Sequence, residues 1–310
     1  MRRAHLPSVR SVAAAACASV AIGLAGTPAT AAPCVLEPGP TRSVVKVIDG
    51  ETLALDDGSE VRLIGALSPR LPDAGADTSF WQPERDARAE LEQAALGKSV
   101  DLAFAPGVRH DRYRRLLAHV FVHTGDGRAW LQGHMLEAGH ARAYALPGHT
   151  GCLEELLAHE QIAREQARGL WTSAAYAIRS AARTRELLAL RATFQIVEGR
   201  VRSASAVKGR VFLNFGADWR DDFTVVLKPQ DARALAAQGV ATKDLAGRSV
   251  RVRGWLDRRG GPIIEISDAR QIEVLEQPDV AAPAPAADAA PRRKRQRPAA
   301  APPASQSSEL

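Results

Sequence analysis

This 310-residue chain is poor in cysteine and has no long apolar run. Its three cysteines are too few for a disulfide-dense scaffold or for a zinc module built from paired CxxC motifs. Because no run of eighteen or more apolar residues occurs, the sequence predicts no stable membrane span. The G-x-S-x-G elbow, the phosphate-binding loop and the dinucleotide fingerprint are also missing, which excludes the enzyme classes that depend on them.

The formal net charge of +6 is concentrated at the two ends of the chain. Arg2, Arg3 and Arg10 contribute +3, and the segment from residue 277 onward contributes a further +2. The residues between these segments therefore carry only +1. Bulk charge does not identify a partner for the body of the protein.

The N-terminal segment has the features of an export signal. Its three arginines precede an apolar, alanine-rich stretch, and an Ala-Thr-Ala sequence at 29–31 has the small-x-small pattern of a cleavage site. We therefore predict a signal peptide over 1–31 and export to the periplasm or the medium. A retained N-terminal anchor is the alternative.

Cleavage at this site removes Cys17 and leaves Cys34 and Cys152. In an oxidising compartment an isolated pair of cysteines predicts one disulfide bond. Two unpaired thiols are the alternative.

The last 34 residues, 277–310, are mostly Ala, Pro, Ser and charged residues. Such a composition predicts a disordered tail, because it offers few large apolar groups to offset chain entropy. The basic cluster at 292–297 either contacts anionic surfaces such as nucleic acid, phospholipid or cell-wall polymer, or is simply solvated.

The body divides by pattern into two modules of the same order. In the first, 41–173, three strand-like runs, a helix from Pro83, two further strands and trailing helices predict an OB-fold-like five-stranded barrel with helices. After a helical linker over 174–192, the segment 193–276 repeats the order of three strands, helix and two strands. We therefore predict a mainly β fold with helices (α+β), with a second small OB-like β-barrel.

Two histidines and a group of aromatic residues are further candidates for a functional role. His119 and His123 alternate on one predicted strand, but no cysteine or acid joins them at ligand spacing, so we predict surface histidines. In the second module several aromatic residues form either a stacking face for single-stranded nucleic acid or, as we favour, the barrel core. These residues are Phe212, Phe215, Trp219, Phe223 and Trp255.

Residues 41–173 carry four motifs in the order typical of one nuclease family. They are Asp-Gly-Glu-Thr at 49–52, Val-Arg-Leu-Ile-Gly at 61–65, Asp-Arg-Tyr-Arg-Arg-Leu-Leu-Ala at 111–118 and Gly-Leu-Trp at 169–171. In these motifs the segment resembles the thermonuclease family, whose domain is staphylococcal-nuclease-like. The resemblance implies calcium-assisted phosphodiester hydrolysis, in which two aspartates help to hold the metal, a glutamate is the general base and two arginines neutralise the phosphate.

Carried over residue by residue, the resemblance leaves the arginines intact. Arg62 and Arg115 match the two phosphate-binding arginines, and Tyr113 matches the tyrosine near the bound nucleotide. The glycine before the second arginine is replaced by Arg114, which we expect to crowd or re-aim that loop.

The acidic positions match less well. Glu51 stands at the first calcium aspartate and is only a weak metal candidate, Leu67 stands at the second, and Arg70 replaces the general base. Glu51 facing three arginines gives an expected formal charge of +2, which favours phosphate over a cation. We therefore expect no cofactor, with calcium possible only if an acid such as Asp73 or Asp77 is recruited.

These observations predict an exported protein that binds nucleic acid or another polyanion, with weak or lost calcium-dependent hydrolysis. One alternative is an active secreted endonuclease that acts on DNA or RNA with a rebuilt metal site. The other is a non-catalytic envelope adaptor.

Overall fold

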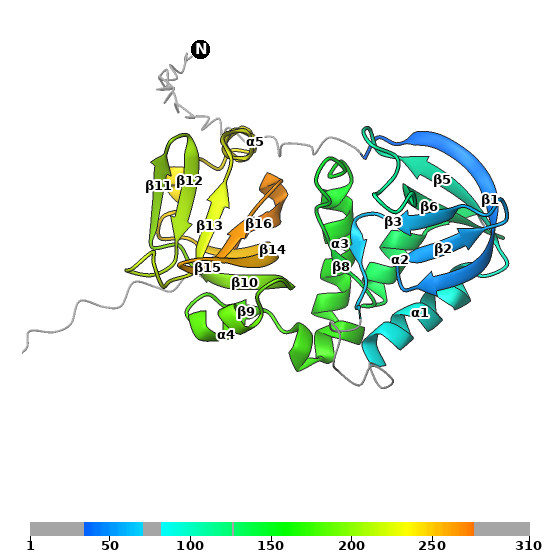
Figure 1. Cartoon of the computed structure of the whole chain (residues 1–310), viewed down its shortest axis with the longest axis horizontal. Coiled ribbons are helices and arrows are strands. Elements are labelled where there is room, and N and C mark those ends of the chain that lie inside the picture. Colours follow the sequence, from blue (N-terminus) through cyan, green and yellow to red (C-terminus); the bar gives the residue numbers. More distant parts are fainter. Residues whose placement is uncertain (1–33, 71–81, 126, 276–310) are drawn as a thin grey trace, which may run out of the picture. The chain divides into compact units, whose positions relative to one another are not determined.

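The structure, a computed structural model, describes residues 34–70, 82–125 and 127–275. The chain divides into two compact units, with the main boundary between Ala175 and Tyr176, and each contains a β-barrel with helices (Figure 1). The predicted signal peptide, the predicted tail at 277–310, and Asp73 and Asp77 lie outside the described residues. Within the described ranges, no helix is long and apolar enough to cross a membrane.

The first unit contains the predicted five-stranded barrel. Its strands run in the order β3-β2-β1-β5-β6, and a parallel pairing of β3 with β6 closes the sheet (Figure 1). They are β1 (Glu37–Asp49), β2 (Thr52–Leu55), β3 (Glu60–Leu63), β5 (Ser99–Phe104) and β6 (Leu116–Thr124). This is the OB-like arrangement that the sequence predicts, so the mixed α+β fold class is confirmed.

Shorter elements complete this unit. β7 (Gly127–Trp130) extends the sheet beyond β6, and β4 (Ala66–Leu67) pairs with β8 (Arg142–Ala143). The helical elements are α1 (Gln82–Ala95), α2 (Leu131–Glu137), α3 (Leu153–Glu165) and η2 (Gly169–Thr172). Helix α1 buries Ala87, Leu91 and Ala95, which recur every four residues and so form one apolar face against the barrel.

A disulfide joins Cys34 to Cys152, as predicted from the sequence. The two Cα atoms are 4.6 Å apart although 118 residues separate them in the chain. Cys152 is buried and immediately precedes α3, and the backbone N–H of Cys34 donates to Glu155 Oε1 on that helix at 2.9 Å. The bond therefore ties the segment before β1 to the start of α3.

The second unit repeats the topology of the first. Its barrel strands pair in the order β11-β12-β13-β15-β14-β10, and β13 and β15 are parallel like β3 and β6. They are β10 (Phe194–Arg200), β11 (Ser203–Val207), β12 (Arg210–Asn214), β13 (Thr224–Leu227), β14 (Ser249–Arg259) and β15 (Gly261–Glu265). β11 and β10 stand at the two ends of this order, but they are consecutive in the chain and only two residues separate them. The sheet therefore closes into a barrel at this bend.

The helix of this unit has the same place in the strand order as α1 of the first unit, and its last strand lies at the edge of the barrel. Helix α5 (Pro229–Ala237) falls between β13 and β14, as α1 falls between β3 and β5, and β16 (Ile272–Val274) pairs with β14. The η4 (Thr242–Leu245) and η5 (Ala269–Gln271) turns lie before and after the β14–β15 hairpin. The OB-like order predicted for this module is therefore present.

The predicted helical linker at 174–192 is only partly helical. It contains η3 (Ala174–Tyr176), β9 (Arg179–Ser180) and α4 (Thr184–Ala189), and β9 pairs with β10. Leu187 and Ala181 are buried in the second core. Tertiary packing of these two side chains makes the segment part of the second unit, which helix propensity alone does not reveal.

Candidate functional site

The turn between β1 and β2 places a buried carboxylate at the edge of the first barrel. Asp49 Oδ1 accepts the backbone N–H of Glu51 at 2.9 Å, so Asp49 holds its own turn, as its position in the sequence indicates. Glu51 follows with only 1% of its surface exposed. A carboxylate this deeply buried needs hydrogen-bonding partners.

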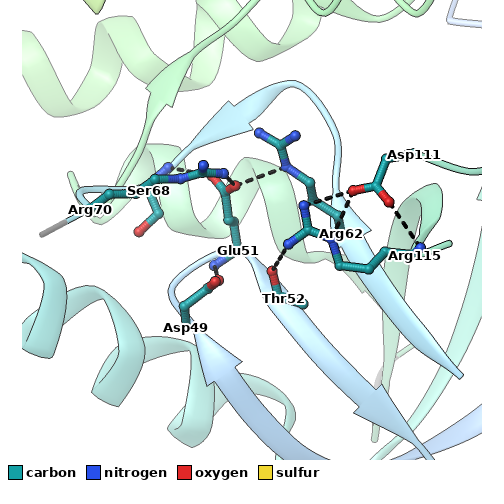
Figure 2. A network of polar contacts seen from close by, with 8 residues as sticks. All are labelled: Asp49, Glu51, Thr52, Arg62, Ser68, Arg70, Asp111 and Arg115. Carbon is teal, nitrogen blue, oxygen red and sulfur yellow. Dashed lines mark hydrogen bonds and ion pairs between the residues drawn. The ribbon is translucent and has the colours of Figure 1, made fainter. Parts of the chain in front are cut away.

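Glu51 has partners on both carboxylate oxygens, as Figure 2 shows. Its Oε1 accepts from Arg62 Nε at 2.8 Å and also from Arg70 Nη2, and its Oε2 accepts from the backbone N–H of Ser68 at 3.1 Å. The residues at the first metal position and at the general-base position therefore form an ion pair with each other. Arg62 donates to the same oxygen of Glu51 as Arg70 does.

Strand β3 presents Arg62 outward. Val61 and Leu63 on either side point into the core, and Arg62 pairs in register with Thr52 of β2. Only its Nε is engaged: among the residues that the structure describes, no acceptor receives a hydrogen bond from its terminal nitrogens. These nitrogens point away from Glu51 in Figure 2, so the planar fork that binds phosphate remains available.

Arg70 is a firmly charged group. Burial alone would lower its pKa, but the Glu51 carboxylate, assisted by Asp49, raises the pKa above its ordinary value. A guanidinium in this state has no lone pair with which to accept a proton. Arg70 therefore cannot serve as the general base whose position it occupies.

Arg115 is held by an acid that the sequence comparison did not single out. Asp111 Oδ2 accepts from Arg115 Nε at 2.8 Å, and Oδ1 accepts the backbone N–H groups of Tyr113 and Arg115 at 2.8 and 3.0 Å. Burial opposes ionisation of Asp111, but the hydrogen bonds from Arg115 lower its pKa overall. This pairing fixes the orientation of Arg115.

Thr52 lies next to both Arg62 and Arg115. Arg115 Nη1 lies 3.5 Å from Thr52 Oγ1, and Thr52 is the register partner of Arg62. The exposed ring of Tyr113 lies 5.4 Å from the Arg115 guanidinium carbon (Figure 2 shows the arginines). Arg62 and Arg70 thus share Glu51, and Arg115 lies beside the residue that pairs with Arg62 across the strands.

Arg114 adopts the left-handed backbone conformation, with φ of 68°. Its N–H donates to Asp111 O at 3.0 Å, which closes the turn before Arg115. An L-residue in this region costs roughly 1–2 kcal/mol, which a glycine does not incur. The substitution of Arg114 for the family's glycine is therefore accommodated as backbone strain.

The net charge of the site differs from the +2 expected above. Asp111 pairs with Arg115, and Asp49 acts on Arg70, so both acids belong to the site. Three acids and three arginines give a formal charge of zero. The predicted charge of +2 did not count Asp111, because the family motif assigns it no role. It did not count Asp49 either, because this residue was expected only to hold its own turn.

The described residues do not fit a calcium ion. Calcium takes about six to eight oxygen ligands, usually with several carboxylates. Across 34–70, 82–125 and 127–275, no three or more His, Cys, Asp or Glu side chains lie close enough together to hold a metal. Both oxygens of Glu51 are engaged by donors, and Leu67 is buried in β4.

His119 is not the surface histidine that we predicted. It is buried, and within the described part of the chain neither ring nitrogen has a hydrogen-bond partner. Burial, with a smaller contribution from His149, lowers its pKa to about 4, so the ring is neutral at pH 7. The Trp130 ring lies 5.4 Å away. His123 is exposed as predicted and pairs with Asp101 at 2.9 Å.

Comparison with known proteins shows what the first domain is similar to. Residues 60–173 match the family "Staphylococcal nuclease homologue". Two relatives from Bacillus subtilis (strain 168), "SPbeta prophage-derived endonuclease YokF" and "Endonuclease YncB", are each 29% identical over 133 residues, or 42% of this chain. The match covers 44% and 61% of their own lengths, so this chain spans about half of each.

A third relative comes from Methanocaldococcus jannaschii. The "Uncharacterized protein MJ1439" is 27% identical over 148 residues, which cover 41% of this chain and 70% of that protein. The resemblance stated from the motifs is therefore confirmed over residues 60–173, which match the staphylococcal nuclease family.

Proposed function

We propose that the first unit binds the phosphodiester backbone of nucleic acid through Arg62 and Arg115, and that its calcium-dependent hydrolysis is weak or lost. The observation that supports this most strongly is the state of Glu51, whose two oxygens are taken by Arg62, Arg70 and the Ser68 N–H. A carboxylate engaged in this way has little capacity left for a metal. The phosphate-binding arginines, in contrast, are both present and both oriented.

Each residue has a distinct part in this proposal. The free fork of Arg62 receives a phosphate, while Asp111 holds Arg115 beside Thr52 so that a second guanidinium faces the same position. The exposed ring of Tyr113 is available to an adjacent base. Glu51 competes with the phosphate for Arg62, so binding is weaker than three free arginines would provide.

Active endonuclease is the second candidate. It is supported by the printed names of the two Bacillus relatives, and it requires acids from outside the described residues, such as Asp73 or Asp77. We further propose that the protein is exported, which is supported by the signal-like N-terminal sequence together with the Cys34–Cys152 disulfide.

The test compares Arg62→Ala with the unaltered chain. Fluorescence anisotropy with labelled DNA and RNA, with calcium or a chelator, should show binding that Arg62→Ala weakens about 10- to 100-fold, as expected for one charge-assisted phosphate contact. Arg42→Ala is the matched control, because Arg42 is an arginine of the same barrel that pairs with Asp57. Its effect should be small.

The same samples distinguish the alternatives. Calcium-dependent cleavage that Arg62→Ala abolishes would support the endonuclease. Neither binding nor cleavage would contradict both proposals and leave the envelope adaptor.

A further inference from the structure

The aromatic residues of the second unit do not share one environment. Phe223 is fully buried, and Phe215 packs against the second core. Trp255 lies edge-on to Phe194, with ring centroids 6.0 Å apart. Phe212 and Trp219 instead line a cavity of about 460 Å³. The predicted core assignment therefore holds for Phe215 and Phe223. It is wrong for Phe212 and Trp219, and also for Trp255, whose surface is 47% exposed.

This cavity lies on the outer face of the barrel. Val211 and Leu213 of β12 point into the second core, so Phe212 and Asn214, which alternate with them, face outward. Ser205 of β11 pairs with Phe212, and Thr224 of β13 pairs with Asn214. All four line the cavity. Gly261, Pro262 and Ile263 of β15, which pairs with β13, line it as well, so the cavity is built on four adjacent strands and is not a gap between loops.

The loop between β12 and β13 presents Trp219 over this face. Asp222 Oδ2 accepts the N–H of Asp218 at 2.8 Å, and Asp218 Oδ1 accepts the N–H of Arg220 at 3.0 Å. The loop packs on the β14–β15 hairpin, where a Cβ on Gly261 would lie only 2.9 Å from Asp221 O. The loop backbone that carries Trp219 is thus held in place, and 58% of the residue's surface is exposed.

A cluster of cations adjoins the cavity. Arg259, Lys228 and Arg210 all approach the carboxylate of Glu265, at 3.2, 3.4 and 3.9 Å. One carboxylate cannot neutralise three cations, so the cluster carries a formal +2. Arg259 also lines the cavity itself. Asp222 lines it too, with its carboxylate accepting an N–H within the loop, so the three cations together with Glu265 and Asp222 leave a formal +1.

We propose that this cavity holds an unpaired base of single-stranded nucleic acid. The base stacks against Trp219 and Phe212, and the neighbouring phosphate lies at the cluster of Arg210, Lys228 and Arg259. Aromatic platforms beside a cationic groove are the usual means of binding single strands. The volume of about 460 Å³ lies within the range of ~300–1,000 Å³ that is typical of small-ligand sites.

A single strand fits better than a duplex, because the bases of a duplex are already stacked on their neighbours and cannot enter a cavity. The choice of nucleic acid over another planar anion rests on the function proposed for the first domain. The site itself belongs to the second unit and shares no residue with the Arg62–Arg115 site.

Binding of a labelled oligothymidine by the full chain tests this proposal, with Trp219→Ala compared with Trp255→Ala. Trp255 is the matched control, because it is a 47%-exposed tryptophan of the same unit and does not line the cavity. In an Arg62→Ala background, which removes the contribution of the first site, Trp219→Ala should raise Kd about 10-fold or more. Trp255→Ala should leave Kd unchanged, and a duplex of the same length should be little affected.

A second measurement does not depend on the folding of an alanine variant. Adding the oligonucleotide should quench tryptophan fluorescence in the Trp255→Ala protein, and this quenching should disappear in Trp219→Phe. Equal Kd values for the two alanine variants, or quenching that persists without Trp219, would overturn the proposal. If Arg62→Ala weakens binding and Trp219→Ala does not, the function proposed for the first domain stands and this inference fails.

Discussion

Glu51→Gln is expected to strengthen binding of nucleic acid by about 10-fold, equivalent to about 1.4 kcal/mol. The glutamine keeps an acceptor for the Ser68 N–H but removes the negative charge that now engages Arg62 and Arg70. The site then changes from a formal charge of zero to +1, and a phosphate no longer competes with a carboxylate for Arg62. Anisotropy titrations at fixed salt measure the change.

The same substitution should lower the free energy of unfolding by about 1–3 kcal/mol, because a buried charged hydrogen bond is lost. Arg70 is largely exposed, so its share of this loss is reduced by solvent. Glu60→Gln is the matched control, because it removes the same charge from an exposed position on β3. A Glu51→Gln protein that binds nucleic acid less tightly than Glu60→Gln would contradict the competition between Glu51 and phosphate.

Loss of the disulfide is the second large effect. Cys34→Ser together with Cys152→Ser should lower the stability of the first unit by about 2–4 kcal/mol, because the bond closes a long loop in the unfolded chain. Urea denaturation of the oxidised protein, the reduced protein and the double variant measures this difference. The last two should agree.

The second unit supplies an internal control for this experiment. It contains neither cysteine, so its unfolding transition should be the same in all three samples. A first-unit transition that is insensitive to reductant would contradict a stabilising role for the bond.

The barrel topology and the disulfide could be predicted from local signals. The turn at Asp49, the alternating burial of β5 and the apolar spacing of α1 each depend on neighbours a few residues away. Cys34 and Cys152 could be paired because cleavage at the predicted site leaves only two cysteines. In all these cases the relevant information lies in short segments or in a simple count.

The features that were missed depend on tertiary contacts. The partner of Arg115 is only four residues away, but a comparison of motifs assigns Asp111 no role. Phe212 faces outward on β12 while its neighbours Val211 and Leu213 face the core, and this choice of face follows from the register between strands. His119 lies in a strand whose exposure is set by Trp130 and by the pairing of β6 with β3. Composition and periodicity do not specify these contacts.

A calcium titration by isothermal calorimetry tests whether Glu51 is available as a metal ligand. Glu51 is bound by Arg62 and Arg70 in place of a metal. The full chain should therefore show no saturable binding up to about 1 mM calcium, a range in which weak extracellular sites already fill. One-site binding well below that concentration, abolished by Glu51→Gln, would show that Glu51 is a metal ligand and would contradict the account.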